Sequence, residues 1–245
     1  MRFHAPTRGA VPAARFDHPV FAALQPWRAW LVGEAWPSVE AMASLFGQAA
    51  GKRGSSPHPV AQSPELLADG LHYETRIYRT GRIATREGSW HDLFNALAWL
   101  AWPQLKAALN RRQACDVERY GPAERSRGQC AVTHMDEAGV VLVLRDAGRV
   151  DAWDRHDWSG LFGGLQAADF AIAVVGHALH EHALEADRLL VGKALVALAD
   201  DPDAALPSIV SDCAAAIADE RLLCDPQELR PLPLMGLPGW HADAG

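Results

Sequence analysis

Apolar residues recur every three to four positions in several stretches of the chain, which is the spacing of one buried face of an α-helix. The first predicted helix covers residues 17–31, with Asp17 as its N-cap and Pro19 in its first turn. A second helix begins after Pro37-Ser38 and is closed by Gly51. Further helices are predicted over residues 91–102, 103–110, 166–184, 189–198 and 208–223.

Alternation of β-formers with polar residues replaces the helical spacing in two places. Residues 71–86 hold Tyr73, Thr75 and Ile77 before the turn signal Thr80-Gly81, and we expect a β-hairpin there. A second hairpin is predicted from strands at 131–135 and 140–144, joined by a turn at 136–139. Loops are predicted for residues 51–64, which are rich in Gly, Pro and Ser, and for the basic segment 111–130.

These elements together predict an α+β fold: a mainly α-helical single globular domain with two short antiparallel β-hairpins. The domain is expected to cover residues 16–245, behind a loose polar arm at residues 1–15. Several prolines at residues 231–240 exclude a helix or a central strand from the tail. Because the tail is also too apolar to be free in water, we expect it to pack along the surface.

The composition is ordinary for a globular protein, with 49% apolar and 22% charged residues and a net charge of −7. This acidic balance argues against nucleic acid or an anionic membrane as a partner. No apolar stretch approaches the roughly 20 residues of a membrane span, and no secretory signal is present, so we expect a cytoplasmic protein. The four cysteines form no CxxC pair and are expected to be reduced thiols.

Positive charge is nevertheless concentrated in one part of the chain. Between residues 71 and 130 basic residues outnumber acidic ones ten to six, whereas after residue 130 acidic residues outnumber basic ones nineteen to seven. Arg76, Lys106 and Asn110 in this segment are candidates for binding a cofactor or a small anionic ligand, such as a phosphate or carboxylate. The alternative is that the two parts of the chain simply attract each other in the fold.

The most unusual polar cluster is Trp90-His91-Asp92-x-x-Asn95, at the start of an apolar helix. His91 and Asn95 are four residues apart and share a helix face, while Asp92 lies in the first turn, where the helix dipole favours a carboxylate. Together with Arg86 they are the candidate catalytic residues, as a general base with its partners or as a metal site. The alternative is structural: a helix cap, an ion pair between Arg86 and Asp92, and hydrogen bonds to buried backbone.

A second cluster, Gly176-His177-x-x-His180-Glu181, lies in the predicted helix 166–184. His177, His180 and Glu181 share one face and are candidate ligands of a divalent metal. Their order is not that of the HExxH signature, so peptidase chemistry is not supported. The alternative is a histidine–glutamate pair in a core helix. Gly176 is expected to mark the close approach of another backbone, such as that of the helix that carries Trp99.

Several segments taken together resemble one known family. They are YETRI at 73–77, GRIATR at 81–86, WHDLFNALAW at 90–99, PQLKAALN at 103–110, RSR at 125–127, DEAG at 136–139, GHALHE at 176–181, KAL at 193–195 and PLPLMGLPGW at 231–240. On them the chain resembles the bacterial domain of unknown function 3025 family, from about residue 15 onward. One departure is Gln113, near the place where that family usually offers a histidine. The resemblance implies a cytoplasmic location and no particular activity.

Two hypotheses of function follow from these residues. In the first, the protein is an enzyme of hydrolytic or acid–base type, with His91 as the base and a divalent metal as the candidate cofactor. In the second, it is a non-catalytic binding or scaffold protein whose polar clusters tie the first predicted hairpin to the core. No GxGxxG, Walker or GxSxG motif points to nucleotide or serine-hydrolase chemistry. The two hypotheses differ in whether both clusters line one cleft.

Overall fold

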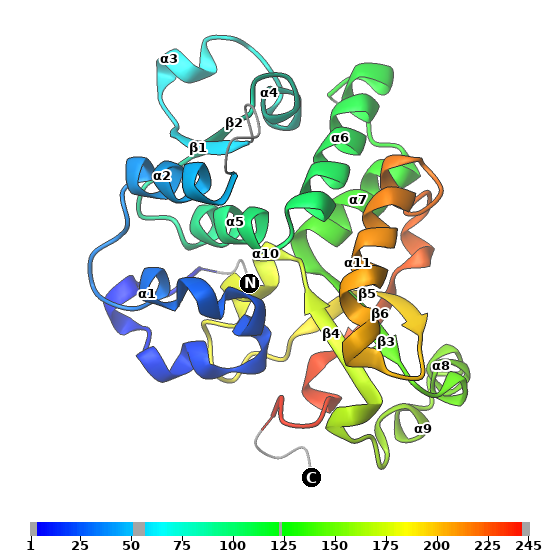
Figure 1. Ribbon diagram of the computed structural model, residues 1–245. Coiled ribbons are helices and arrows are strands. Elements are labelled where there is room, and N and C mark those ends of the chain that lie inside the picture. Colours follow the sequence, from blue (N-terminus) through cyan, green and yellow to red (C-terminus); the bar gives the residue numbers. More distant parts are fainter. Residues whose placement is uncertain (1–3, 51–56, 123, 242–245) are drawn as a thin grey trace.

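Two groups of elements lie on either side of a central pair of helices, α5 (Trp90–Ala101) and α10 (His177–His182), as Figure 1 shows. This is a computed structural model, which describes residues 4–50, 57–122 and 124–241. The chain has the mainly helical α+β fold that the apolar pattern predicts. Among the described residues, no helix is long and apolar enough to cross a membrane.

The first group contains the N-terminal helices and a small sheet. The helix expected at 17–31 is instead a 3₁₀ helix followed by a short α-helix, and its N-cap is His18, whose Nδ1 accepts from the Val20 amide. The elements are η1 (Arg8–Ala10), η2 (Ala13–Asp17), η3 (Pro19–Trp27), α1 (Arg28–Leu31), α2 (Val39–Ala50), β1 (His58–Ala61), α3 (Pro64–Leu67), α4 (Tyr73–Thr80) and β2 (Arg82–Thr85).

The hairpin predicted at 71–86 is wrong, because its first half is helix α4. Tyr73 and Ile77 fit an alternating pattern, but they are also four residues apart and share a helix face. Gly81, expected in a hairpin turn, ends the helix at φ 69°, and its amide donates to the carbonyl of Ile77. Strand β2 then pairs in parallel with β1. Strand β1 lies within residues 51–64, for which a loop is predicted.

The second group is built on a four-stranded sheet in the order β4-β3-β5-β6. Strand β3 (Gly139–Leu144) lies antiparallel to β4 (Phe170–Val174) and parallel to β5 (Val191–Leu198), and β6 (Arg230–Pro233) forms the edge. The helices predicted at 166–184 and 189–198 are therefore wrong over most of their length. Buried strands form nearly continuous apolar runs, which cannot be told from buried helices by spacing alone.

Helices α7 (Arg127–Ala138) and α11 (Pro202–Ala218) pack against this sheet, and α6 (Pro103–Tyr120) packs against both of them, so the three helices lie together in Figure 1. The loop predicted at 111–130 is wrong over its first ten and last four residues, because α6 extends to Tyr120 and α7 begins at Arg127. Within α6, Arg112 and Asp116 are paired four residues apart. Helix α7 replaces the first strand of the second predicted hairpin, while its second strand is part of β3. Asp201 caps α11, which begins before the predicted start at Ser208.

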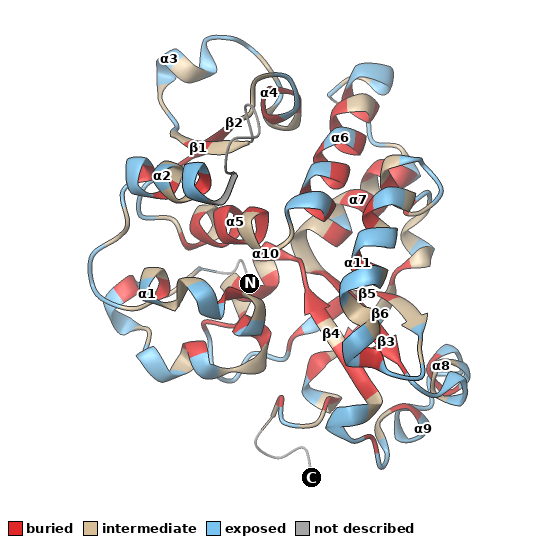
Figure 2. Ribbon diagram, in the orientation of Figure 1, coloured by how far each residue is buried: buried red, intermediate tan, exposed pale blue. Residues whose placement is uncertain are grey.

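The buried residues concentrate in α5 and in the sheet (Figure 2). The remaining elements are α8 (Ala147–Asp154), α9 (Trp158–Phe162), η4 (Ala167–Asp169), η5 (Pro226–Glu228) and η6 (Leu234–Gly236). The proline-rich tail follows the expectation: it supplies an edge strand and buries Leu232, Leu237 and Trp240.

The expected arm at residues 1–15 makes specific contacts within its described part. Arg8 is buried, donates to the carbonyls of Trp30 and Val32, and lies over the ring of Trp36. Residues 1–3 and Gly51 lie outside the described residues. The division into an arm and one domain over residues 16–245 stays a prediction.

Candidate functional site

The two histidine-bearing helices meet at the centre of the fold. Helix α5 starts at Trp90 because Ser89 caps it through a bond from the Asp92 amide, and this places His91 in its first turn. Helix α10 starts at His177 after Gly176. A side chain at Gly176 would lie 2.5 Å from both the Ala138 Cα and the Glu137 carbonyl oxygen, so only glycine fits there. The close backbone is thus the end of α7, not the helix that carries Trp99.

This close approach brings His177 next to the acidic end of α7. The His177 Nε2 atom lies 3.0 Å from His91 Nε2 and 3.6 Å from Glu137 Oε2. One ligand atom from each of these three side chains lies within 4.8 Å of the other two. His177 is buried, whereas the Glu137 side chain is 43% exposed. The cluster of His91, Glu137 and His177, called the triad below, is therefore open on its Glu137 side.

A carboxylate stands behind each imidazole of the triad. Glu181 Oε2 lies 3.0 Å from His91 Nδ1, and this hydrogen bond raises the pKa of His91. Asp136 Oδ2 lies 3.9 Å from His177 Nδ1. Burial nevertheless lowers the pKa of His177 to about 3, so its ring is neutral at pH 7. In both rings the Nδ1 atom faces a carboxylate and the Nε2 atom faces the centre of the triad.

A buried hydrogen-bond network holds Asp136 in place. Lys106 Nζ donates to Asp136 Oδ1 and, at 2.9 Å, to Asn95 Oδ1, while Asn95 Nδ2 donates to the Tyr73 hydroxyl at 2.9 Å. Burial acts to raise the pKa of Asp136, but the charge and hydrogen bond of Lys106 together with the nearby imidazoles of His177 and His91 outweigh it, and the pKa is lowered. Asp136 is therefore an anion, and helices α4, α5, α6 and α7 each contribute one member of the network.

The triad borders a polar cavity of about 260 Å³. Glu74 lines this cavity as well, and Asn110 Nδ2 donates to its side-chain oxygen at 2.7 Å and to its carbonyl at 2.9 Å. Burial, reinforced by the negative charge of Asp136, raises the pKa of Glu74 to about 7. The cavity thus combines the triad with a carboxyl group that exchanges its proton near neutral pH. Its residues are Gln62, Tyr73, Glu74, Ala84, Arg86, His91, Asp92, Asn95, Asp136, Glu137 and His177.

The candidate catalytic residues all line this cavity, in different roles. His91 belongs to the triad, and Asn95 belongs to the Lys106 network. Arg86 and Asp92 bind each other, with 2.7 Å between Arg86 Nη2 and Asp92 Oδ1. The ion pair between Arg86 and Asp92 is thus the one that the structural alternative expects, and the carboxylate beside the His91 imidazole is that of Glu181.

Among the candidate metal ligands, His177 and Glu181 reach the cluster and His180 does not. The buried ring of His180 packs against Phe21 and Phe94, with centroid distances of 5.8 and 5.6 Å, and burial lowers its pKa to about 4. His177 lies in the first turn of α10, against α7, whereas the side chain of His180 points into the core. His180 is a core residue.

The candidate cofactor-binding residues also separate. Arg76 forms a paired contact with Asp69, at 2.6 Å, and does not line the cavity. Lys106 and Asn110 lie next to residues of the cavity, but each is hydrogen-bonded to an acidic side chain, Lys106 to Asp136 and Asn110 to Glu74. A small anionic ligand stays a prediction.

Sequence analysis missed the acidic members of the site, Glu74, Asp136 and Glu137. Glu74 was assigned to a strand, and Asp136-Glu137 to a hairpin turn, where acidic residues need no further explanation. The signal that was available is the adjacent pair of acids at the C-terminal end of a helix, where the helix dipole disfavours negative charge.

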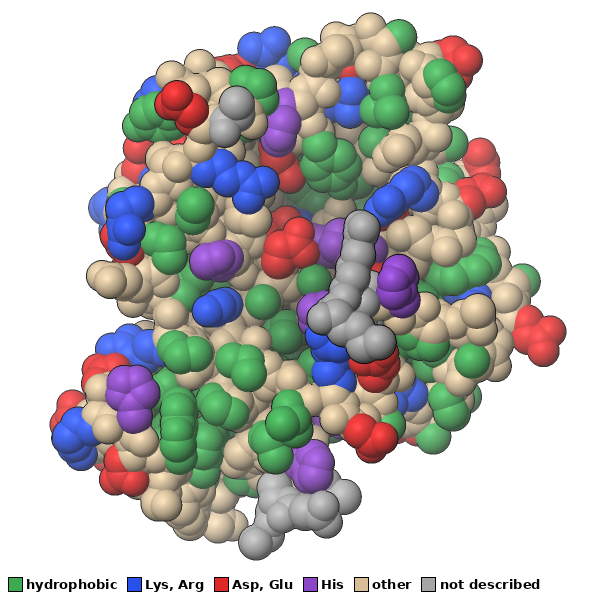
Figure 3. Space-filling view, turned by 180° about the vertical axis from the view of Figure 1, so that it is seen from behind, with side chains coloured by type: hydrophobic (Ala, Val, Ile, Leu, Met, Phe, Trp, Pro, Cys, Tyr) green, Lys and Arg blue, Asp and Glu red, His purple; other side chains and the backbone are tan. Residues whose placement is uncertain are grey.

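Histidine side chains gather near the middle of the face shown in Figure 3, with acidic and basic side chains beside them.

Comparison with known proteins gives one result. The model of a family described as protein of unknown function (DUF3025) matches residues 58–245, a range that contains the whole triad and its carboxylates. No curated protein and no solved structure matches the chain.

Proposed function

The chain belongs to the DUF3025 family, and we propose that this member binds one divalent metal ion through His91, Glu137 and His177 and hydrolyses a substrate held in the adjoining cavity. The observation that carries the proposal is the 3.0 Å separation of the two Nε2 atoms, with a carboxylate oxygen 3.6 Å from one of them. Zinc is the metal whose usual ligands and distances this set matches best.

The spacing of the triad fits a metal site. Ligand atoms 2.0–2.2 Å from a tetrahedral zinc ion lie about 3.3–3.6 Å from one another. The distances of 3.0 and 3.6 Å are close to that range, whereas the third distance, between His91 and Glu137, is longer but within 4.8 Å, so Glu137 would move slightly toward His91 to bind the ion. Two histidines and one glutamate leave a fourth position free, as in catalytic rather than structural zinc sites.

The carboxylates behind the imidazoles favour the same interpretation. A carboxylate that accepts from Nδ1–H fixes the tautomer with its lone pair on Nε2 and makes that nitrogen a better ligand. Glu181 does this for His91, whereas Asp136 lies 3.9 Å from His177 Nδ1 and would have to move closer to accept from it. Two Nε2 lone pairs 3.0 Å apart repel each other unless a proton or a cation lies between them.

The charges around the triad balance a divalent ion. Glu137, Glu181 and Asp136 carry three negative charges, and Lys106 carries one positive charge. The resulting charge of −2 is neutralised by a divalent cation, which makes binding of such an ion electrostatically favourable. The histidines stay neutral when they ligate a metal, so they do not change this balance.

The cavity supports hydrolysis rather than a purely structural metal site. A bound metal ion lowers the pKa of a coordinated water to about 7 and polarises a carbonyl. Glu74 is a proton acceptor with a matching pKa of about 7 in the same cavity, and Asn110 fixes the direction of its carboxyl group. Asn95 and Tyr73 offer hydrogen bonds to a polar substrate group. We also propose that the protein is cytoplasmic.

The test is metal titration of protein stripped with a chelator. Wild type is expected to bind one equivalent of Zn²⁺ or Co²⁺, and Co²⁺ should produce a tetrahedral visible spectrum. H177A and E137Q should bind at least about 100-fold more weakly, and E181Q about 10–100-fold more weakly, because it only removes the support of His91. H134A is the matched control, since His134 is an exposed histidine on α7.

The catalytic part is tested with a panel of esters and amides. The chelated protein should be inactive, and one equivalent of Zn²⁺ should restore turnover. Binding of the metal by H177A as tightly as by wild type would contradict the site. A metal-loaded protein that hydrolyses no member of the panel would leave a metal site and refute the hydrolytic role.

A further inference from the structure

The triad stands on the border between two cavities of different chemistry. His91 and Glu137 line both the polar cavity of about 260 Å³ and a second cavity of about 500 Å³. We infer that the substrate of the proposed site is an amphipathic ester or amide, whose polar part lies in the first cavity and whose apolar part lies in the second. This inference rests on the proposed function.

The second cavity has a larger share of apolar side chains than the first: they are six of its eleven lining residues, and the other five are His91, Glu137, Glu181, His182 and Arg188. The apolar side chains come from the end of α7, from α10, from the segment that leads into β5 and from the first residue of β5, and they are Ala138, Ala178, Leu179, Leu189, Leu190 and Val191. Its volume lies within the roughly 300–1,000 Å³ of small-molecule sites, which are mostly apolar with a few polar groups. Glu181, the hydrogen-bond partner of His91, also lines this cavity, so the cavity is directly adjacent to the triad.

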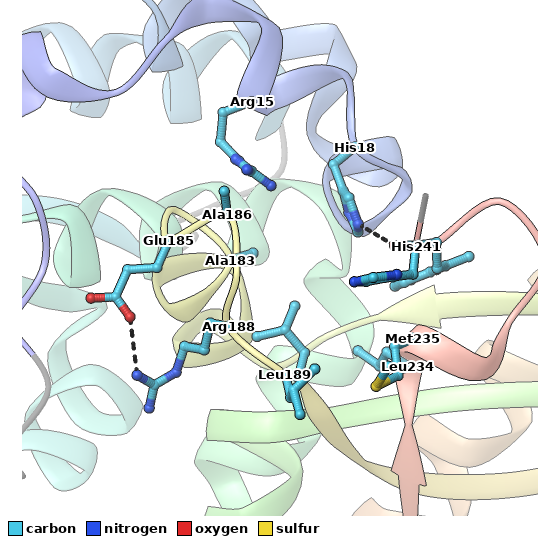
Figure 4. A pocket seen from close by; sticks show the side chains of 12 residues that line it. Arg15, His18, Ala183, Glu185, Ala186, Arg188, Leu189, Leu234, Met235 and His241 are labelled. Atoms are coloured by element: carbon cyan, nitrogen blue, oxygen red, sulfur yellow. Dashed lines mark hydrogen bonds and ion pairs between the residues drawn. The ribbon is translucent and has the colours of Figure 1, made fainter. Parts of the chain in front are cut away.

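Two residues of this lining are unusually exposed for their type. The exposed fraction is 64% for Leu189 and 47% for Val191. Figure 4 shows Leu189 and Arg188 on the segment between α10 and β5, with Arg188 turned toward Glu185, to which it is bound at 3.1 Å. This segment therefore offers the cavity the apolar side chains of Leu189 and Leu190 together with Arg188, whose charge is paired with that of Glu185.

The polar cavity on the other side of the triad provides hydrogen-bonding groups instead. Gln62, Tyr73 and Asn95 line it together with Glu74. An ester or amide bond placed at the triad is thus flanked by polar groups on one side and by apolar side chains on the other. Apolar surface buried in the second cavity contributes binding energy that a wholly polar substrate lacks.

The reaction balances without any further reactant. Water adds its oxygen to the carbonyl carbon, and the bond from that carbon to the ester oxygen or amide nitrogen breaks. One proton of the water goes to the leaving oxygen or nitrogen, with Glu74 as the carrier, and the products are a carboxylic acid and an alcohol or amine.

The test uses alkyl hydroxamates as probes, since the hydroxamate group binds the metal and the alkyl chain lies beside it. Acetohydroxamate and octanohydroxamate are titrated into the Co²⁺-loaded protein, and binding is followed in the visible spectrum. The longer probe is expected to bind at least about tenfold more tightly, because six more methylene groups enter the apolar cavity. L189D and V191D should reduce this ratio toward one. L198D is the matched control, because Leu198 is an exposed leucine of β5 that does not line the cavity.

The outcomes separate the two proposals. Failure to bind Co²⁺ refutes the proposed function and this inference with it. Binding of Co²⁺ and of both hydroxamates with equal affinity overturns the amphipathic substrate alone. A chain-length ratio that L189D and V191D leave unchanged, or that L198D reduces equally, also overturns it, because the chain then lies elsewhere.

Discussion

Replacement of Lys106 by Met tests how strongly the network behind the triad depends on charge pairing. Lys106 is 3% exposed and its partner Asp136 14% exposed, so K106M removes the ammonium group and leaves a buried carboxylate without its cation. Breaking a buried ion pair by removing one partner costs about 3–5 kcal/mol, whereas replacing both partners by neutral groups is often nearly neutral. We therefore expect K106M to lower the free energy of unfolding by about 3–5 kcal/mol and K106M/D136N to recover most of that loss.

The assay is urea unfolding of chelated protein, followed by circular dichroism. With a slope of about 2–3 kcal/mol per molar urea, the K106M midpoint should fall by about 1–2.5 M. A bound divalent ion compensates Asp136 in part, so one equivalent of Zn²⁺ should reduce the loss. The reasoning is refuted if K106M costs less than about 1 kcal/mol, or if the double variant is no more stable than K106M.

Three further predictions concern single residues. The folded-state pKa of Glu74, raised to about 7, makes its ionisation unfavourable in the folded state, so the stability of wild type falls as pH rises from about 4.5 to 7. In chelated protein, the free energy of unfolding of E74Q relative to wild type should therefore increase by about 3 kcal/mol between pH 4.5 and 8. A difference in denaturation midpoints that stays constant with pH would count against the raised pKa. G176A should destabilise the protein by at least about 2 kcal/mol and weaken Zn²⁺ binding, because the new methyl group meets the Ala138 backbone. An unchanged melting temperature of G176A would contradict this close approach. H180A should lower the free energy of unfolding by about 2–4 kcal/mol by leaving a core cavity, yet keep the Zn²⁺ affinity that H177A loses; weaker Zn²⁺ binding by folded H180A would make His180 a ligand after all.

The sequence patterns located the helical part of the site well. The polar start of α5 was predicted within one residue, because Ser89 is a strong cap and the helix behind it is apolar on its buried face. The decisive condition, that the helices of His91 and His177 meet, was posed from the sequence and is answered by the 3.0 Å contact between their rings.

The strands and the acidic residues were harder to predict for one physical reason. A strand that is buried over most of its length, such as β4, shows no alternation, and neither does the nearly continuous apolar run of β5. A helix such as α4 or α7 that carries β-branched residues resembles a strand over a few positions. The pattern at residues 131–144 predicts a hairpin where α7 lies, and in that prediction Asp136 and Glu137 belong to the turn. Their approach to His177 depends on Gly176, and packing of this kind between remote segments has no local signal.

Anomalous diffraction from crystals grown with one equivalent of Zn²⁺ tests the metal site most directly. The account predicts a single strong peak about 2.0–2.2 Å from His91 Nε2, His177 Nε2 and a carboxylate oxygen of Glu137, with the fourth position facing the polar cavity. A peak at other residues, or the absence of any peak while the two imidazoles stay in direct contact, would contradict it.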